Sequence, residues 1–496
     1  MKHFFELDKN KIYIGSSDKL PEWSRDDQSK AVEKVMLMLK NYLELDNVSF
    51  LFGSGSSIHL GAVAIRNFPL EVEEHVKSIN AVEANKGIYD ELIGSIKNIQ
   101  SQFLKELQST ITSDEAVSPN PDSLASEETE LTVEARNGWK FTIKDNLIRD
   151  AVSKEIAIEF ERVLNYLIAR DYLLDEDTSV DRTDKVKELI VAIKEGLFSV
   201  CDVESRAIPT WLIEAKKGSG FDHDKQHASL LESGNKYIFH EKFIKAILQR
   251  PLNLKRANIF TANYDLAFEY AFDRLGVHYI DGFSGFHKRF FKPETFEFDL
   301  FYPGSTTSGK VQRIEKVVRY FKLHGSLSWV NSEMRDATNL YGIEEMPLGL
   351  ISNMDKKGEI IVYPSAVKKS YTLDFPYSEL FRQFASTITQ SQSVLVTVGY
   401  SFADDHFNDI IFQALSNPTF TLIIVDYKGT SNPYILRLKD LDDPRIIILE
   451  GAFFGDFLTL ANNLMPDFIG IDNHGKVADT LNKLFSSPKK AGGENE

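Results

Sequence analysis

A glycine- and serine-rich segment, Gly53-Ser54-Gly55-Ser56-Ser57, directly follows the apolar run at residues 48–52. Glycines after a strand permit a tight turn and let backbone N–H groups approach a pyrophosphate, which then lies at the positive N-terminus of a helix. The third glycine of a GxGxxG pattern is missing, because position 58 is isoleucine. The segment predicts a strand, a glycine turn and a helix, and it serves either phosphate binding or a simple turn.

The segment Thr261-Ala262-Asn263-Tyr264-Asp265 ends another apolar run, residues 257–261. Ligands of open α/β sheets bind beyond the carboxyl ends of the strands, where an amide and a carboxylate two residues apart can both face a ribose. The alternative is structural: Asp265 caps the helix expected over 265–275, and Asn263 is a turn residue.

His324 follows a third apolar run, residues 317–323, and is itself followed by Gly325. A histidine at the end of a strand can act as a base with little steric hindrance. The alternative is a hydrogen-bonded core histidine.

A fourth segment, Gly399-Tyr400-Ser401-Phe402, lies between the run 393–398 and a helix expected near Asp404. It repeats the order of strand, glycine, hydroxyl and helix, and suits a second phosphate or a ribose. Asp426 ends the run 420–425 and suits the hydroxyls of an adenosine ribose, or else a plain turn.

The elements that must position these residues are short Val- and Ile-rich strands alternating with helices. Further strands are expected at 359–363 and 445–449, and helices at 29–45, 404–415 and 453–464. This alternation predicts a doubly wound, Rossmann-like parallel sheet covered on both faces. Residues 71–250 read differently, as long amphipathic stretches such as 149–174 and 184–199, and predict a large helical insertion.

Composition narrows the class of protein. The chain has 496 residues, too many for one ordinary core, and a formal charge of −16, which disfavours direct nucleic-acid binding. No apolar run approaches the ~18 residues that span a bilayer, and the N-terminal residues turn acidic too early for a secretory signal. The one cysteine, Cys201, excludes internal disulfides and a multi-cysteine zinc site. We therefore expect a cytoplasmic protein without zinc or membrane contact.

In this order, the four segments resemble the motifs of the sirtuin family. The sirtuin pattern GAGxSxxxGxPDFR aligns with residues 53–66 without a gap. The matching positions are Gly53, Gly55, Ser57, Gly61 and Arg66. The TANYD segment at 261–265 resembles the TTNYD form of the sirtuin T-Q-N-x-D element. The LHG segment at 323–325 resembles the catalytic LHG motif, and the GYSF segment at 399–402 resembles the bacterial form of the GTS motif.

The departures from the family pattern favour one branch of it. Sirtuin deacylases carry two Cys-x-x-Cys pairs, whereas this chain has only Cys201, and their PDF tripeptide is Val63-Ala64-Ile65 here. Position 262 holds alanine in place of the family's glutamine. The chain is most similar to zinc-free, sirtuin-like NAD hydrolases of bacterial anti-phage defence, of the type that works with a HerA-type ATPase in a large complex.

This resemblance implies an NAD glycohydrolase (NADase) that cleaves the nicotinamide–ribose bond. Asn263 would orient water and a ribose hydroxyl, His324 would accept a proton, and Asp265 would stabilise the site. Residues implied in holding the diphosphate and adenosine are Gly53, Ser54, Gly55, Ser56, Ser57, Arg66, Gly399, Tyr400, Ser401, Phe402 and Asp426. The implied core spans residues 1–70 and 251–475, interrupted by the insertion at 71–250, which carries a mobile acidic loop at about 109–138; a flexible tail covers 476–496.

Three other functions stay open. The same pocket would serve a sensor that binds NAD or ADP-ribose and gates a partner without chemistry. The chain would otherwise be an assembly subunit whose helices mediate homo-oligomerisation and contact with the ATPase. A protein deacylase is the third, and zinc content with acyl-lysine turnover would reveal it.

Overall fold

The computed structural model describes residues 4–63, 68–82, 85–96, 98–99, 131–134, 140–143, 160–176, 185–302, 313–351 and 375–466. The strand expected at 359–363, the tail at 476–496 and most of the loop expected at 109–138 lie outside these residues. The described part of that loop is β4 (Leu131–Glu134), which pairs antiparallel with β5 (Lys140–Ile143), just after the loop.

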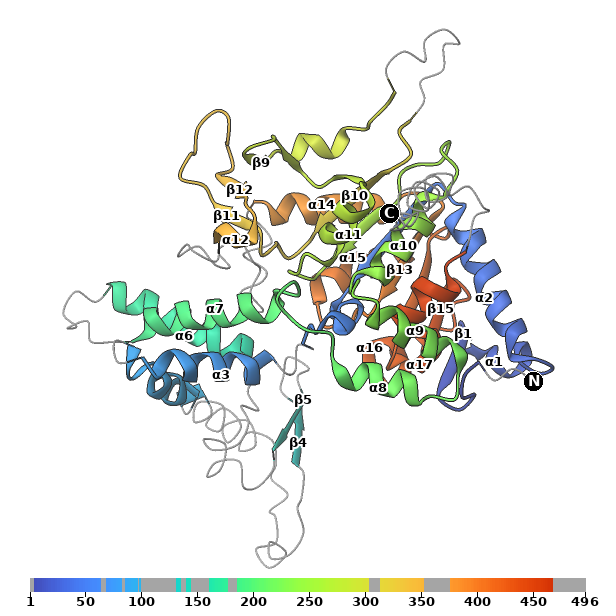
Figure 1. The fold of residues 1–496 in the computed structure, drawn as a ribbon, viewed down its shortest axis with the longest axis horizontal. Helices are drawn as coiled ribbons and strands as arrows, with labels where there is room; N and C mark the ends of the chain where they lie inside the picture. Colours follow the sequence, from blue (N-terminus) through green and yellow to red (C-terminus); the bar gives the residue numbers. More distant parts are fainter. Residues whose placement is uncertain are drawn as a thin grey trace, which may run out of the picture.

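A nine-stranded sheet forms the centre of the molecule, in the order β2-β1-β15-β14-β13-β3-β6-β10-β7 (Figure 1). The strands from β15 to β7 are parallel, and the hairpin of β1 and β2 adds an antiparallel edge. The bounds are β1 Asn10–Ile14, β2 Ser17–Asp18, β3 Asn47–Phe52, β6 Asn258–Thr261, β7 His278–Ile280, β10 Val317–Lys322, β13 Ser393–Val398, β14 Thr421–Asp426 and β15 Ile446–Glu450.

Helices cover both faces of this sheet because its strands are apolar on both sides. Phe50 and Phe52 of β3 face a core shared with α2, α10 and α11, whereas Leu51 faces a core shared with α14, α15 and α16. The bounds are α2 Gln28–Leu43, α10 Ile238–Leu248, α11 Ala267–Leu275, α14 Tyr377–Ile388, α15 Asp405–Leu415 and α16 Pro433–Asp440. The predicted doubly wound α/β fold is confirmed.

The described part of the chain between β3 and β6 is mainly helical, and its helices divide between two cores. Helices α3 (Phe68–Asn80), α6 (Phe160–Glu176) and α7 (Val186–Cys201) share a separate core that includes Val76, Leu164 and Ile193. They lie together at one side of the sheet (Figure 1). Helix α8 (Thr210–Gly218) leads into α9 (Asp222–Glu232) and α10, and the buried side chains of α9 and α10 pack into the core of the sheet.

A second sheet, of four short antiparallel strands, was not predicted. Its order is β11-β12-β9-β8, with bounds β8 Phe283–Ser284, β9 Arg289–Phe291, β11 Trp329–Asn331 and β12 Ile343–Glu345. Strands of two or three residues with mixed polarity carry too little periodicity to be recognised. Two further short helices are α1 (Leu20–Trp23), which follows β2, and α12 (Leu348–Ile351), which follows β12.

The helix expected over 453–464 is broken into shorter pieces. α17 (Gly451–Phe454) and α18 (Phe457–Thr459) are separated at Gly455, and a π-helical turn follows at Leu460–Leu464. A Cβ atom at Gly455 would lie 2.2 Å from the Asp426 carbonyl oxygen, so only glycine fits at this position without a shift of the backbone.

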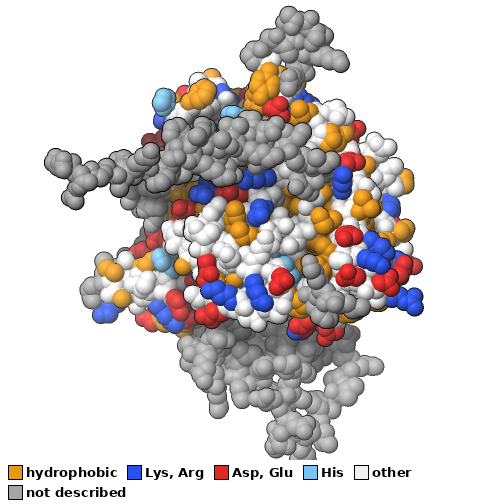
Figure 2. Space-filling model, turned by 45° about the vertical axis from the view of Figure 1, so that its right-hand side comes forward, with side chains coloured by type: hydrophobic (Ala, Val, Ile, Leu, Met, Phe, Trp, Pro, Cys, Tyr) orange, Lys and Arg blue, Asp and Glu red, His pale blue; other side chains and the backbone are white. Residues whose placement is uncertain are grey.

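On the face drawn in Figure 2, lysine and arginine side chains are scattered among aspartate and glutamate. Over the described ranges, the model contains no helix long and apolar enough to cross a membrane.

Candidate functional site

The register of the central strands brings four candidate segments to one edge of the sheet. Phe52 pairs with Thr261 on one side and with Val398 on the other, and Thr261 pairs with Lys322. The segments that follow these residues therefore begin at the same level, beyond the carboxyl ends of parallel strands. The chain leaves β3 toward β6 on one side, while β13 extends the sheet on the other, which makes this point a topological switch.

The two glycine segments contact each other directly at the switch point. The Gly53 N–H donates to the Val398 carbonyl at 3.0 Å, and the Gly55 N–H donates to the Gly399 carbonyl at 3.1 Å. Gly399 has φ +58°, and a Cβ atom there would lie 2.6 Å from the Gly55 Cα. Glycine is required at these positions by backbone contact, whatever ligand they hold.

The prediction of a helix directly after the first glycine segment is wrong. Residues Ser54–Ser56 and Ile58–Leu60 form two 3₁₀ turns, the second ended by Gly61 at φ +88°. Serine hydroxyls compete for local backbone groups and favour turns: Ser56 Oγ donates to the Gly53 carbonyl at 2.8 Å. A phosphate here would meet turn N–H groups, not the N-terminus of an α-helix. Arg66 lies outside the described residues.

Asn263 ties its own loop to the first glycine segment. Its Nδ2 donates to the Gly53 carbonyl at 3.0 Å and approaches Ser57 Oγ at 3.3 Å. Its backbone N–H donates to Thr261 Oγ1 at 3.0 Å. These bonds use nitrogen only, and the side chain is half-buried at the edge of the sheet.

His324 lies within hydrogen-bond distance of Asp404, a residue that sequence reasoning missed. Its Nε2 lies 3.0 Å from Asp404 Oδ2, and both side chains are largely buried. The ring stacks on Phe407 with centroids 4.9 Å apart and planes at 23°. Asp404 is the N-cap residue of α15. In the sequence it indicates only the start of a helix after the GYSF segment, and nothing there pairs it with His324.

Asp265 is buried and belongs to a charged network with Lys322 and Glu269. Its Oδ1 accepts from the Ala267 N–H at 3.0 Å, at the start of α11, so the structural role weighed for it is present. Burial raises the pKa of Asp265, and the nearby Lys322 charge opposes this. Lys322 donates to the Asp265 carbonyl and to Glu269 Oε1, the latter at 2.8 Å.

A second acidic group, also missed, lies on the small sheet. Arg289 Nη2 donates to both oxygens of Asp281 at 2.9 Å, and Nη1 pairs with Glu345. Burial and the Asp281 charge raise the pKa of Glu345. Ser328 Oγ reaches Glu345 at 3.3 Å, which links this group to the loop that carries His324.

The GYSF segment presents backbone and one hydroxyl to the edge. The side chains of Tyr400 and Phe402 are buried in the core, while Ser401 is exposed. Asp426 Oδ1 accepts from the N–H groups of Lys428 at 2.9 Å and Gly429 at 2.8 Å, the bonds of a turn aspartate. Burial raises the pKa of Asp426.

Among the described side chains, no group of three or more His, Cys, Asp and Glu residues is arranged to bind a metal ion.

Comparison with known proteins links this edge to one domain type. No curated protein sequence matches the chain. Residues 257–432 match the family model of the SIR2-like domain. The matched range includes Asn263, Asp265, His324, the GYSF segment and Asp426. The first glycine segment lies outside the matched range, but it follows β3, which pairs with β6 and β13 of that range. The chain is thus similar to sirtuin-like proteins over residues 257–432, and a SIR2-like domain implies NAD binding and NAD-related activity.

Proposed function

We propose that this protein is an NAD glycohydrolase: it cleaves the bond between nicotinamide and ribose with water and releases nicotinamide, ADP-ribose and a proton. The observation that carries the proposal is the meeting of two glycine segments, Asn263 and His324 at one edge of the sheet. The SIR2-like match over residues 257–432 supports NAD as the ligand.

The reaction needs few protein groups. Nicotinamide leaves a cationic pyridinium as a neutral base, so its departure requires no general acid, and the transition state is an oxocarbenium-like ribose. His324 accepts the proton that water or a ribose hydroxyl gives up. The Asn263 side-chain oxygen accepts a hydrogen bond from the same water or hydroxyl.

The acidic surroundings suit a positive charge at C1′ of the ribose. Asp265 and Glu269 lie buried with Lys322 as their nearby cation. A buried negative charge stabilises a developing cation more strongly than an exposed one, because solvent screens it less. Asp265 therefore contributes electrostatically, in addition to its bond to the start of α11.

Cysteine content favours hydrolysis over deacylation. The single cysteine, Cys201, is buried, and burial raises the pKa of its thiol. The chain cannot supply the two cysteine pairs that the zinc module of sirtuin deacylases requires.

The biological role that we propose is depletion of cytoplasmic NAD during phage infection. The separate core of α3, α6 and α7 offers a unit for homo-oligomerisation or for contact with a HerA-type ATPase. Control by assembly would restrain a toxic activity in the uninfected cell.

Chromatography of NAD incubated with the purified protein tests the activity. We expect nicotinamide and ADP-ribose in equal amounts. Binding of NAD without release of nicotinamide, both alone and with an added HerA-type ATPase, would favour a sensor that gates a partner. Acyl-lysine turnover would favour the deacylase.

A further inference from the structure

We propose that Asp404 is a positioning residue: it holds His324 in one tautomer, with hydrogen on Nε2, and so leaves Nδ1 as the basic nitrogen. The kinetic consequence rests on the proposed function, whereas the tautomer itself does not.

The hydrogen-bond chemistry of the pair fixes the tautomer. A carboxylate can only accept, so the hydrogen between His324 Nε2 and Asp404 Oδ2, which lie 3.0 Å apart, belongs to the ring. In a neutral imidazole the other nitrogen is then the acceptor. Among the described residues, no hydrogen-bond partner is found for Nδ1.

Asp404 does not do what its place in the helix predicts. An aspartate at the N-cap normally accepts from a backbone N–H one or two residues into the helix. The side chain of Asp404 makes no such bond. Its carboxylate reaches His324 across the sheet edge instead, although the neighbouring N-terminus of α15 still favours its negative charge.

The ring of His324 is held on its faces as well. Phe407, from the first turn of α15, stacks on it, and the Tyr264 ring lies 6.3 Å away. Among the described residues, the titratable groups next to the ring are Tyr264 and Asp404. Tyr400 approaches from the GYSF segment, where its hydroxyl lies 3.4 Å from the Asp404 carbonyl.

Asp404 therefore orients His324 as a carboxylate orients a catalytic base. Without the carboxylate the histidine remains in place, but the ring hydrogen can lie on the other nitrogen. In Asp404→Asn, the amide can donate to Nε2 and so place the ring hydrogen on Nδ1. We expect kcat for NAD to fall about 10²-fold with KM changed by less than about twofold. Asp405→Asn is the matched control: it removes the same charge from the next residue, which is exposed.

Nitrogen-15 NMR of imidazole-labelled histidine tests the tautomer directly, with the His324 signals assigned by their loss in His324→Gln. We expect hydrogen on Nε2 in the wild type and in Asp405→Asn, and a shift toward Nδ1 in Asp404→Asn. Hydrogen on Nδ1 in the wild type, or identical spectra for wild type and Asp404→Asn, would overturn the proposal. A kcat of Asp404→Asn within threefold of wild type would do the same.

The two proposals fail separately. If the tautomer responds as expected but no version of the protein releases nicotinamide, the proposed function falls and the positioning of His324 by Asp404 stands.

Discussion

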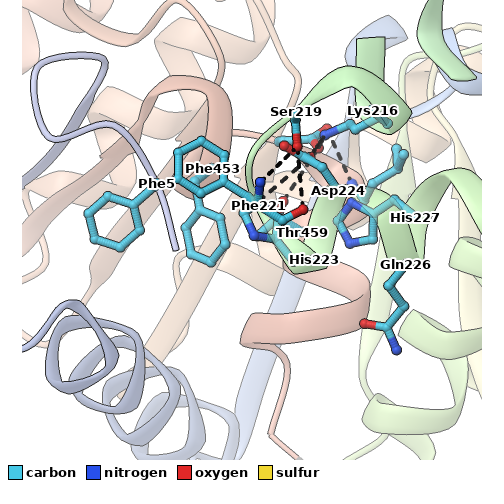
Figure 3. Close-up of polar contacts among 12 residues, drawn as sticks. Phe5, Lys216, Ser219, Phe221, His223, Asp224, Gln226, His227, Phe453 and Thr459 are labelled. Carbon is cyan, nitrogen blue, oxygen red and sulfur yellow. Dashed lines mark hydrogen bonds and ion pairs between the residues drawn. The ribbon is translucent and has the colours of Figure 1, made fainter. Parts of the chain in front are cut away.

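The pair of His324 and Asp404 and a second buried group, the Lys216 cluster, both place histidine near carboxylate, and in the cluster a lysine also joins two carboxylates. The Lys216 cluster comprises Lys216, His223, Asp224, His227, Asp456 and Asn463. Lys216 Nζ lies 2.7 Å from Asp224 and 3.1 Å from Asp456, and so joins α8 and α9 to the start of α18. Figure 3 shows Lys216 beside Asp224, with the rings of His223 and His227 next to them.

Burial and neighbouring charges shift the pKa values of the groups in the Lys216 cluster. Burial alone would lower the pKa of Lys216, but the charges of Asp456 and Asp224 outweigh it and raise that pKa. Burial lowers the pKa of His223 to about 4 and also lowers the pKa of His227. In the cluster one lysine is thus shared by two aspartates beside neutral histidines, an arrangement that links helices structurally. The pair instead follows two of the parallel strands, at the end of the sheet where the glycine segments lie.

We expect the greatest change in turnover from the loss of Asn263, which lies at the carboxyl ends of the parallel strands. Asn263→Ala removes the amide that joins Gly53 and is proposed to orient water, so kcat should fall about 10²- to 10³-fold. Initial rates of nicotinamide release measure it. The matched control is Asn462→Ala, a half-buried asparagine near the Lys216 cluster. Equal losses in both variants would break the comparison.

The next effect is on stability and concerns the cluster. Lys216→Met leaves Asp224 and Asp456 without their shared cation, so the free energy of unfolding should fall by about 3 kcal/mol. Turnover per folded molecule should be unchanged. Urea titration measures the loss, and Lys217→Met, on an exposed neighbour that pairs with Glu232, should change stability by less than about 1 kcal/mol. If Lys216→Met were as stable as the wild type but inactive, the cluster would have a role in turnover and not in stability.

A third buried group is a stacked histidine pair, His59 from the turn after the first glycine segment and His240 from α10, and it bears on stability in acid. Their ring centroids lie 5.3 Å apart, and no hydrogen-bond partner is found for either ring among the described residues. Burial lowers the pKa of His59 to about 4, so the unfolded chain binds a proton there between pH 6.5 and 4 that the folded chain does not. Stability therefore falls as pH falls through this window.

For His59 alone this loss reaches about 3 kcal/mol at pH 4. His59→Phe should flatten the pH dependence of unfolding by that amount while preserving stability near pH 7. An unchanged slope between pH 6.5 and 4 would show that His59 is not kept neutral by the fold.

The smallest effect concerns Asp426. Asp426→Asn keeps an oxygen for the bonds from Lys428 and Gly429 and removes only the charge. If the carboxylate also binds the adenosine ribose, KM for NAD should rise up to about tenfold with kcat unchanged. An unchanged KM would make Asp426 a turn residue only.

The central strands were predictable because each is a continuous apolar run. Residues 393–398 match β13, and 317–323 overlap β10 almost completely. The edge strand β1 and the small sheet were not, since short strands with mixed polarity leave no clear period. The 3₁₀ turns after Gly53 were missed because the pattern of strand and glycine suggests an α-helix, while the serines favour turns.

The candidate site was predictable as far as its motifs lie at strand ends. Asn263 and His324 follow β6 and β10, and parallel pairing must bring such residues to one edge. Asp404 could not be paired with His324, because their contact depends on how α15 packs against the loop after β10. The same holds for Arg289 and Glu345, which the small sheet brings together.

NAD turnover by the wild type and by His324→Ala, compared at equal concentrations of folded protein, tests the central claim most directly. We expect release of nicotinamide and ADP-ribose by the wild type and a rate lower by about 10²- to 10⁴-fold in the variant. Equal rates in the two proteins would contradict it, because the edge that joins the glycine segments, Asn263 and His324 would then not be where NAD is cleaved.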